Sequence, residues 1–364
     1  MKRLLLMSLA GLIGIGLLAA ATVCLTSGCS TLGYYAQSAG GHLGVLRAAK
    51  PVGDWLAEPG TPAALKQRLE LTQRMRDFAV GELKLPDNAS YRRYADLKRN
   101  AAVWNVVAAP ELSLSLKQWC FPIVGCIGYR GYFEQTEAQA FADGLKRDGL
   151  EISVYGVPAY STLGTLPGRF FADPLLNTFV FYGEGDLARL IFHELAHQVA
   201  YAKGDTMFNE SYATAVERIG SERWLTEHAS AETRAQTVAS DRRREDFRAL
   251  TFKYRDKLAA VYADTARDDA SKRSAKAAVM AELRDEYAAL KAGPWGGFAG
   301  YDGWFARANN ASFGVLAAYN ELVPQFERLF ERQGRDFACF HAEVRRLADL
   351  PYAERRAALT AQGV

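Results

Sequence analysis

The sequence predicts an α+β fold that is predominantly helical, with a small mixed sheet and a long helical hairpin inserted into the chain. Apolar residues recur at helical spacing over most of the sequence, and strand-like patterns are concentrated between residues 101 and 157. Residues 229–290 contain neither glycine nor proline, which favours two long helices. A chain of 364 residues can bury one large core and carry a smaller appendage.

Composition and charge argue against a role in nucleic-acid binding. The hydrophobic fraction of 49% and the charged fraction of 23% are those of an ordinary globular protein. The formal net charge is only +3, and basic residues are interleaved with acidic ones. We therefore expect no nucleic-acid partner.

The N-terminus has the pattern of an export signal. Lys2 and Arg3 precede an apolar run over residues 4–25, and small residues then precede Cys29, which resembles a bacterial lipobox. Residues 1–28 are expected to be a lipoprotein signal peptide, Cys29 to carry the lipid, and residues 29–60 to lead from the membrane into the fold. A single membrane-spanning helix is the alternative. Ser30 after the cysteine implies, by resemblance to bacterial lipoproteins, a periplasmic protein on the outer membrane of the cell envelope.

Export also changes how the cysteines are interpreted. Cys120 and Cys126 bracket a short loop that favours a turn, and in an oxidising compartment we expect them to form a disulfide. Two free thiols are the alternative. Cys339 lies between Ala338 and Phe340, so it is predicted to be a small buried hydrophobe.

The elements can be placed in chain order. Thr61 and Pro62 resemble an N-cap followed by proline at the first helical position, and they open a predicted helix over residues 61–81. Alternation and apolar runs then predict a strand region, one short helix and further strands. The predicted strands are 103–107, 112–116, 127–133, 150–157, 159–164 and 177–183, and the helix is 137–147.

The second half of the chain is predicted to be helical. One helix runs from residue 186 to about 203, where Gly204 and Asp205 end it, and a second begins near Asn209. Residues 229–292 form the inserted hairpin, with a narrow apolar seam. A last helical region covers residues 311–359. Residues 61–228 and 293–364 would then make one domain, which is interrupted by the hairpin. The charged hairpin faces are interpreted as solvated, or alternatively as an arm for a protein partner.

The sequence HELAH at residues 193–197 predicts a metal site. His193 and His197 are four residues apart on one helix, so both imidazoles can bind one ion. Glu194 lies beside the first ligand, where it can reach a water on the metal and act as general base. A zinc ion bound by these histidines would polarise a carbonyl and would lower the pKa of the water bound to it toward about 7. The alternative is two core histidines next to an exposed acid.

A catalytic zinc ion needs a third protein ligand. Residue 203, six residues after His197, is a lysine and not a histidine. Glu210 is the better candidate, because it opens the following helix after a turn that can fold it back on the first. Glu217 is seven residues further on the same face and is the competing choice. Asn209 is expected to be the N-cap of this second helix.

At this point the sequence resembles a known group. HELAHQ at 193–198 and FNESYATAVE at 208–217 are similar to the HELAHQ and NEGFA motifs of alanyl/leucyl aminopeptidases, which are gluzincin metallopeptidases. The resemblance implies a zincin-like core and Glu210 as the third zinc ligand. The whole chain also resembles a bacterial lipoprotein family labelled putative aminopeptidase. The segments that carry this resemblance are SGCSTLGYYAQ at 27–37, WCFPIVGC at 119–126 and NNASFG at 309–314.

The resemblance also implies where substrate would bind. In thermolysin-like gluzincins an edge strand pairs with an extended peptide, and residues 159–164, which include Tyr160, match it in position. These residues contain no acid to hold a free amine, which argues against an aminopeptidase, and Glu184 and Asp173 are the candidates to substitute. The oxyanion donor would come from near the position of the family's catalytic tyrosine. The candidates there are Asn310, Tyr301 and Tyr319.

These observations lead to one hypothesis and two alternatives. The hypothesis is zinc-dependent hydrolysis of peptides in the cell envelope, with Glu194 as general base and an aminopeptidase as the specific activity. The first alternative is an endopeptidase acting on one envelope protein. The second is a non-catalytic lipoprotein scaffold that binds a protein partner through the hairpin.

Overall fold

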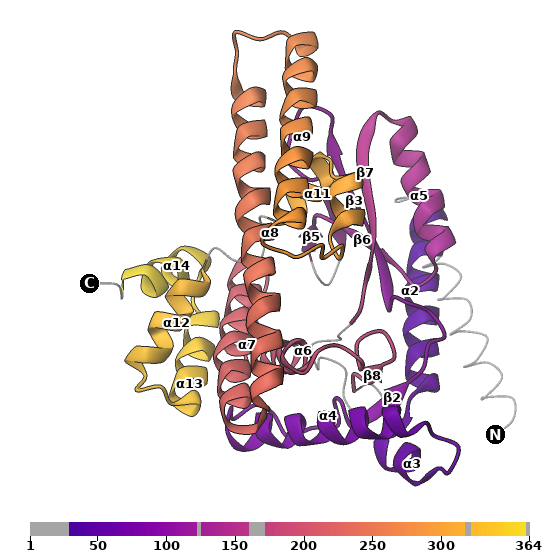
Figure 1. The fold of residues 1–364 in the computed structure, drawn as a ribbon, viewed down its shortest axis with the longest axis vertical. Coiled ribbons are helices and arrows are strands. Elements are labelled where there is room, and N and C mark those ends of the chain that lie inside the picture. The colour runs from indigo at the N-terminus through magenta and orange to yellow at the C-terminus, as the bar shows by residue number, and fades with distance from the viewer. Residues whose placement is uncertain (1–28, 122–124, 160–171, 317–321, 362–364) are drawn as a thin grey trace, which may run out of the picture.

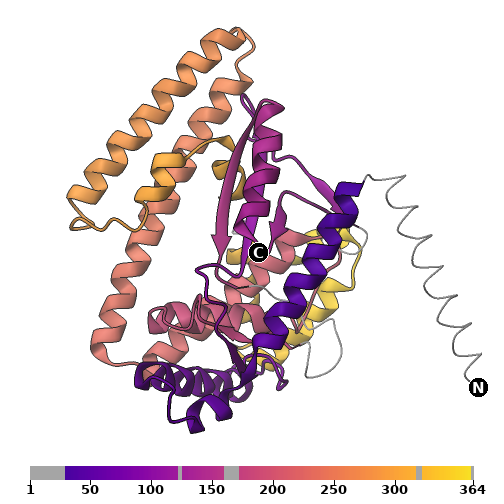
Figure 2. The ribbon, with the colours of Figure 1, turned by 90° about the vertical axis from the view of Figure 1, so that its right-hand side faces the viewer.

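The computed structural model describes residues 29–121, 125–159, 172–316 and 322–361 (Figure 1). The fold is 62% helical with small sheets, which confirms the predominantly helical α+β class. The hairpin extends from one end of the molecule, and helix α4 (Ala63–Gly81) crosses the opposite end (Figures 1 and 2). Within the described residues, no helix combines the length and apolarity that crossing a membrane requires.

The N-terminal part packs helices around a short sheet. Helices α2 (Cys29–Ala48) and α3 (Val52–Ala57) flank β1 (Lys50–Pro51), which pairs with β2 (Arg93–Ala95). Helix α4 confirms the predicted helix at 61–81, but Pro62 and not Thr61 is its N-cap, without a side-chain cap. Its apolar stripe faces the main core. The buried members of the stripe are Leu65, Leu69, Leu71, Met75, Phe78 and Ala79.

The larger sheet has β3 (Val103–Pro110) at its centre. It pairs antiparallel with β6 (Arg130–Tyr132) and β7 (Leu150–Val157). Helix α5 (Gln135–Arg147) covers one face, where Val106 and Ala108 of β3 are buried. Helix α11 (Asn310–Leu316) packs on the other face, against Val107 and Ala109. Because both faces are covered, β3 is a nearly continuous apolar run.

Two predicted strands are wrong. Residues 112–116 form no strand, and their alternation instead reflects two packing sites: Leu114 packs against the hairpin core and Leu116 against the α11 side of the sheet. Residues 177–183 form a turn after β8 (Leu175–Leu176), in which the amide of Tyr182 donates to the carbonyl of Phe179. The predicted strand at 159–164 lies outside the described residues beyond Ala159.

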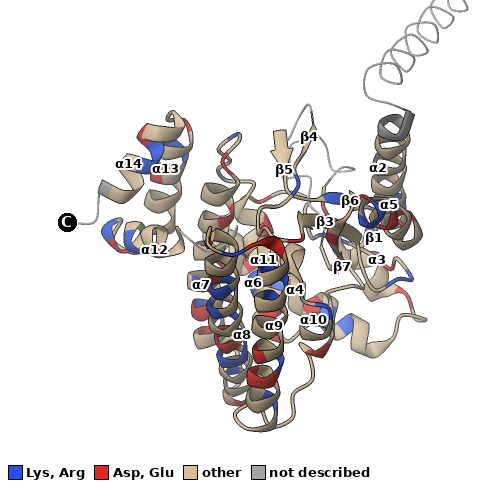
Figure 3. Cartoon of the chain, turned by 90° about the horizontal axis from the view of Figure 1, so that it is seen from above, with Lys and Arg blue, Asp and Glu red and all other residues tan. Residues whose placement is uncertain are grey.

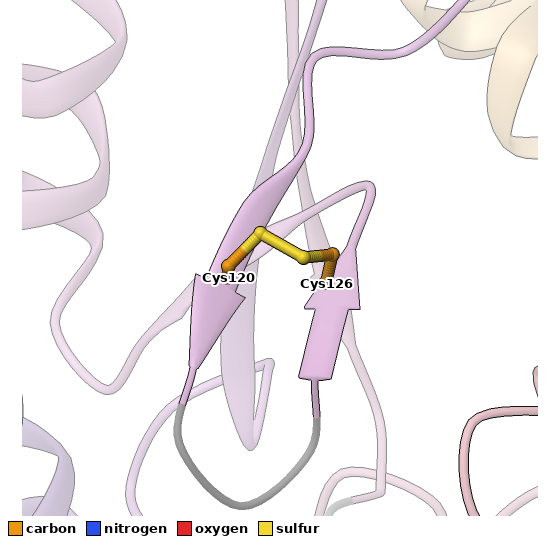
Figure 4. The surroundings of a disulfide bond; sticks show 2 residues. All are labelled: Cys120 and Cys126. Atoms are coloured by element: carbon orange, nitrogen blue, oxygen red, sulfur yellow. A yellow bond between two sulfur atoms is a disulfide. The ribbon is translucent and has the colours of Figure 1, made fainter.

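The predicted disulfide between Cys120 and Cys126 is present (Figure 4). The two cysteines face each other across β4 (Trp119–Phe121) and β5 (Gly125–Ile127), an antiparallel pair. Residues 122–124 between the strands lie outside the described part. The bond closes a small loop, so it constrains the unfolded chain only locally.

The predicted helical hairpin consists of α8 (Ala231–Ala263) and α9 (Asp269–Ala292). The buried residues of its apolar seam are Phe247, Leu250, Tyr254 and Leu258 of α8 and Val279, Met280, Leu283 and Tyr287 of α9. Lysines, arginines and acids are intermingled along both helices (Figure 3). The seam continues into the segment after the hairpin, because Trp295, Phe305 of α10 (Asp302–Arg307) and Phe313 belong to the same apolar cluster. This shared cluster anchors the base of the hairpin to α11 and so to the sheet.

Three helices end the chain: α12 (Val323–Arg332), α13 (Phe337–Ala348) and α14 (Tyr352–Ala361). They lie on the side of α7 (Thr206–His228) away from the sheet (Figure 1). The predicted burial of Cys339 is wrong, since its thiol is free and exposed. Asp336 caps α13 by accepting the amide of Cys339, which places that residue in the exposed first turn.

A buried histidine joins α13 to α7. The ring of His341 has its Nε2 at 2.8 Å from the carbonyl of Leu83 and its Nδ1 at 2.8 Å from the hydroxyl of Tyr212. The carbonyl can only accept, so Nε2 carries the proton and Nδ1 accepts from the tyrosine. Both contacts are satisfied by a neutral imidazole. Burial lowers the pKa of His341 to about 4.

Acid is therefore expected to destabilise the fold through His341. The folded state holds this imidazole neutral, whereas the unfolded chain takes up its proton near pH 6.5. The stabilising effect is complete above about pH 6.5 and is lost as the pH falls toward 4, by roughly 3 kcal/mol in total. Urea unfolding in the presence of a chelator, between pH 7 and 4, should show this slope. The slope should be smaller in His341→Gln, and an unchanged slope would contradict the assignment.

Candidate metal centre

The candidate metal site is built on two packed helices. Helix α6 (Glu184–Ala196) buries Leu187, Ile191 and Leu195 in the main core, and α7 packs beside it through Phe208 and Tyr212. Helix α6 is shorter than the helix predicted from residue 186 to about 203, because it ends at Ala196 with His197 as its C-cap. Residues 197–205 then form a loop that returns the chain to the start of α7. This turn brings the beginning of α7 next to the end of α6.

Three side chains converge at this junction. The Nε2 atoms of His193 and His197 are 3.1 Å apart. The Oε2 atom of Glu210 lies 3.2 Å from Nε2 of His193 and 3.6 Å from Nε2 of His197. These three residues form the group among the described residues that could hold a metal ion.

The donor geometry fits a tetrahedral ion. Zinc–ligand bonds of about 2.0–2.1 Å place neighbouring donor atoms of a tetrahedral site roughly 3.3 Å apart. The three observed separations lie on either side of this value. Two imidazole nitrogens and one carboxylate oxygen are also the donor set of catalytic sites that keep a fourth position open.

The electrostatics of the group favour a cation. Burial by itself lowers the pKa of His193, but hydrogen bonds to Glu210 and Glu217 outweigh it and raise this pKa well above its usual value. Burial raises the pKa of Glu210, but contacts with both histidines outweigh it and lower that pKa to about 2. Two carboxylates therefore face His193, and this arrangement favours a cation such as a metal ion.

Glu194 lies beside the ligands without being one. No hydrogen bond to its carboxylate is found among the described residues, whereas Glu210 and Glu217 both contact His193. Burial raises the pKa of Glu194, the two histidines lower it, and Glu210 and Asp173 raise it further. A carboxylate in such surroundings binds a proton more readily than usual, which is what a general base requires.

Asn209 is not the N-cap of α7, so this prediction is wrong. Asp205 is the cap, because its side chain accepts the amide of Phe208 at 3.1 Å. The amide group of Asn209 instead makes two hydrogen bonds to the backbone of Ala202, at 2.7 and 2.9 Å. This clamp closes the loop between the two helices and holds the neighbouring Glu210 toward the histidines.

Glu217 contacts the ring nitrogen of His193 that faces away from His197 and Glu210. Its Oε2 accepts from Nδ1 of His193 at 2.8 Å, two helical turns after Glu210 on the same helix. This contact leaves Nε2 of His193 free to face the other ligand atoms. The geometry therefore favours Glu210 as the third ligand, with Glu217 orienting the imidazole.

Replacing Glu217 with glutamine is expected to weaken metal binding by roughly 10- to 100-fold, because the amide retains an acceptor for Nδ1–H but loses the charge. Competition with a chromophoric chelator measures the affinity. Glu222→Gln is the matched control, since Glu222 is exposed on the same helix. Equal affinities in the two variants would show that Glu217 does not orient the ligand.

The other predicted site residues lie elsewhere. Asn310 is buried, where it accepts from the hydroxyl of Tyr262 and donates to the carbonyls of Pro110 and Glu111, so its amide is committed to holding α11. Tyr301 stacks on Phe247 of the hairpin. Tyr160 and Tyr319, and the side chain of Cys29, lie outside the described residues.

The two acids considered for amine binding are also engaged. Glu184 accepts the indole N–H of Trp224 at 2.9 Å, which joins the start of α6 to α7. Asp173 is buried and acts electrostatically on Glu194 and on the buried phenol of Tyr91. Neither side chain is an exposed acid facing the ligands.

Three tyrosines that interact electrostatically with Glu210 or with one another were not predicted from the sequence. Tyr129 is 36% exposed, but partial desolvation of its phenol raises its pKa to about 12, and the carboxylate of Glu210 and the phenols of Tyr155 and Tyr201 contribute to the rise. Tyr201 is 46% exposed, and partial desolvation raises its pKa with a further contribution from Glu210. Tyr129 lies between β5 and β6, three residues after Cys126. Its closeness in sequence to the predicted disulfide was the available signal for it.

Comparison with known proteins now adds the family. A family model described as "Putative aminopeptidase" matches residues 33–359, which is nearly the whole chain and includes every metal-site residue. The chain belongs to this aminopeptidase family. The family name indicates a peptidase, in agreement with a site that could hold a metal ion. No curated protein and no solved structure matches the chain.

Proposed function

We propose that this protein is a zinc metallopeptidase of the bacterial cell envelope that acts as an aminopeptidase. The observation that carries the proposal is the convergence of His193, His197 and Glu210 with the unpaired carboxylate of Glu194 beside them. Two imidazoles and one carboxylate favour zinc over harder cations, which prefer oxygen ligands alone. Family membership supports peptides as the substrate class.

The chain's own residues account for the main steps of hydrolysis. A zinc ion bound there supplies Lewis acidity toward a peptide carbonyl and toward water. The carboxylate of Glu194 takes a proton from the attacking water and later delivers it to the leaving amine. Glu217 holds Nδ1 of His193, and the clamp of Asn209 on Ala202 keeps Glu210 in place.

We assign Tyr129, which lies between β5 and β6, to the developing oxyanion, because its phenol interacts electrostatically with the carboxylate of Glu210. Tyr129→Phe should lower kcat by about 10²-fold with little change in KM, since the donor acts mainly on the transition state. Steady-state kinetics on a short peptide measures both constants. Tyr352→Phe, at an exposed position on α14, is the control. A change confined to KM would assign Tyr129 to ground-state binding instead.

The lipid anchor is a second part of the proposal, supported by the charged and apolar N-terminus that ends at Cys29. Labelling with a fatty acid tests it in cells. Label should enter the wild-type protein and be absent from Cys29→Ser. Label retained in that variant would rule out lipidation at Cys29.

The enzymatic proposal is tested with soluble protein that begins after Cys29. Elemental analysis should give about one zinc ion per chain, and a chelator should remove both the zinc and the hydrolysis of peptides. Peptides with a free N-terminus should be cleaved one residue at a time, and acetylated copies should resist. Cleavage of the acetylated copies alone would indicate the endopeptidase. No cleavage of either set by zinc-loaded protein would overturn the proposal.

A further inference from the structure

A cavity of about 410 Å³ lies next to the metal ligands. His193 and Glu194 line one end of it. Leu190 and Asp186, about one and two helical turns before His193, continue the wall along α6, and Tyr182 of the preceding turn also lines the cavity. The cavity therefore runs from the general base along α6 toward the first residues of that helix.

This direction assigns the cavity to the leaving part of the substrate. In the proposed mechanism Glu194 delivers a proton to the leaving amine, so that nitrogen lies within hydrogen-bond reach of its carboxylate. The other two candidate ligands, His197 and Glu210, do not line the cavity, which places it on the Glu194 side of the metal site. From His193 to Asp186 the helix rises about 10 Å, the length of roughly three extended residues. The cavity can thus hold the residue that follows the scissile bond.

The charged side chains along the cavity wall are paired with one another. The guanidinium of Arg189 donates to both carboxylate oxygens of Asp241, at 2.5 and 2.7 Å. Arg244 donates to Asp186 at 2.6 Å and to Asp241 at 3.4 Å. Two cations therefore face two carboxylates, and their charges balance without any substrate. The other charges of the cavity are the carboxylates at its metal end, which disfavour an acidic side chain of the substrate.

Two residues supply the apolar part of the cavity wall. Tyr182 lines the cavity and is 39% exposed, and Leu190 lines it while packing against the main core. Arg68 of α4 holds the turn that carries the tyrosine, because its guanidinium donates to the carbonyl of Val180 at 2.8 Å and to the carbonyl of Tyr182. The turn is thus tied to α4, which keeps Tyr182 at the cavity.

An exposed aromatic ring beside a leucine gains from the hydrophobic effect only when a ligand covers it. Removing a large apolar side chain from water favours binding by roughly 10- to 100-fold. We propose that Tyr182 and Leu190 bind a large apolar side chain of the residue that follows the scissile bond. This inference rests on the proposed peptidase function and adds a substrate preference to it.

The test uses two series of tripeptide amides, one with the second residue varied and one with the first residue varied. Phenylalanine, leucine, alanine, lysine and glutamate are compared at each position. In wild-type protein, kcat/KM should be roughly 10- to 100-fold higher for phenylalanine than for alanine at the second position, and lowest for glutamate. Tyr182→Ala should remove most of this preference, whereas the first-position series should keep its order.

Two further variants serve as controls. Phe181→Ala changes the neighbouring aromatic residue, which is 57% exposed and does not line the cavity, so it should behave as wild type. Tyr182→Phe keeps the ring and should keep the preference. Equal values across the second-position series in wild type, or equal losses on all peptides in Tyr182→Ala, would overturn the apolar subsite. So would a preference at the first position that Tyr182→Ala abolishes.

A binding measurement separates this inference from the peptidase proposal. Calorimetric titration of the second-position phenylalanine and alanine peptides into zinc-loaded Glu194→Gln protein measures affinity without turnover. The phenylalanine peptide should bind more tightly, and adding Tyr182→Ala to this variant should remove most of the difference. If wild-type protein cleaves neither series but this difference is found, the peptidase proposal fails and the apolar subsite stands. Equal affinity for the two peptides would overturn the subsite.

Discussion

Replacing Glu194 with glutamine is expected to lower kcat for peptide hydrolysis by at least about 10³-fold while zinc remains bound. Glutamine has nearly the same shape as glutamate but cannot take up a proton. The variant therefore loses the general base and keeps the metal ligands. Glu194 makes no contact that holds the ligands, which depend on Glu210 and Glu217. Peptide cleavage is measured by chromatography, and zinc content by elemental analysis of the same sample.

The controls separate chemistry from metal loss. Glu222→Gln changes an exposed glutamate on α7 and should leave both readouts at wild-type values. His197→Ala removes a ligand and should lose zinc and activity together. Full activity in Glu194→Gln would sink the proposed mechanism, and zinc loss in that variant would mean that Glu194 supports the metal.

Replacing Arg355 with alanine is expected to destabilise the fold by about 3–5 kcal/mol, the usual cost of removing one partner of a buried ion pair. The side chains of Arg355 and Asp205 are 6% and 2% exposed, and their atoms are 2.8 Å apart. Arg355 also donates to the carbonyls of Leu347, Ala348 and Leu350, so α14 is tied to the end of α13. The variant leaves Asp205 buried with only Arg356 to neutralise it.

The loss of Arg355 should also weaken metal binding. Asp205 caps α7 one turn before Glu210, so a disturbed cap would displace the third ligand. Urea unfolding measures the stability, and chelator competition measures the metal affinity. Arg346→Ala removes an exposed arginine that pairs with the partly buried Glu343 on α13, and it should cost less than about 1 kcal/mol. Equal losses in the two variants would argue against the buried pair as an anchor of α7.

Much of the metal site was predictable because it depends on local spacing. A spacing of four residues from one histidine to the next on a helix places both side chains on one face, whatever surrounds them. Glu210 was predicted as third ligand because a short connection returns the second helix to the first, and the structure brings its carboxylate to both imidazoles. The hairpin was predictable for the same reason, since its seam is periodic over many turns.

The incorrect predictions concern positions where one local pattern fits two structures. Alternating leucines at 112–116 were read as a strand, but they serve two separate apolar clusters. Asn209 and Asp205 are both good N-cap residues, and only the hydrogen bonds to Phe208 and Ala202 decide between them. Cys339 was expected to be buried as a small hydrophobe, but the capping of α13 by Asp336 places it at an exposed position in the first turn of the helix.

The sequence by itself determined the helical class, the disulfide, the hairpin and the group of two histidines and one glutamate, because each follows from spacing along the chain. Tertiary structure alone decided which carboxylate orients His193, which arginines face the cavity, and that Arg355 holds the cap of α7. Asp205 and Arg355 are 150 residues apart, and His193 and Glu217 are 24 apart. Contacts between distant residues leave no periodic trace, because they depend on how the packed helices are placed and not on local conformation.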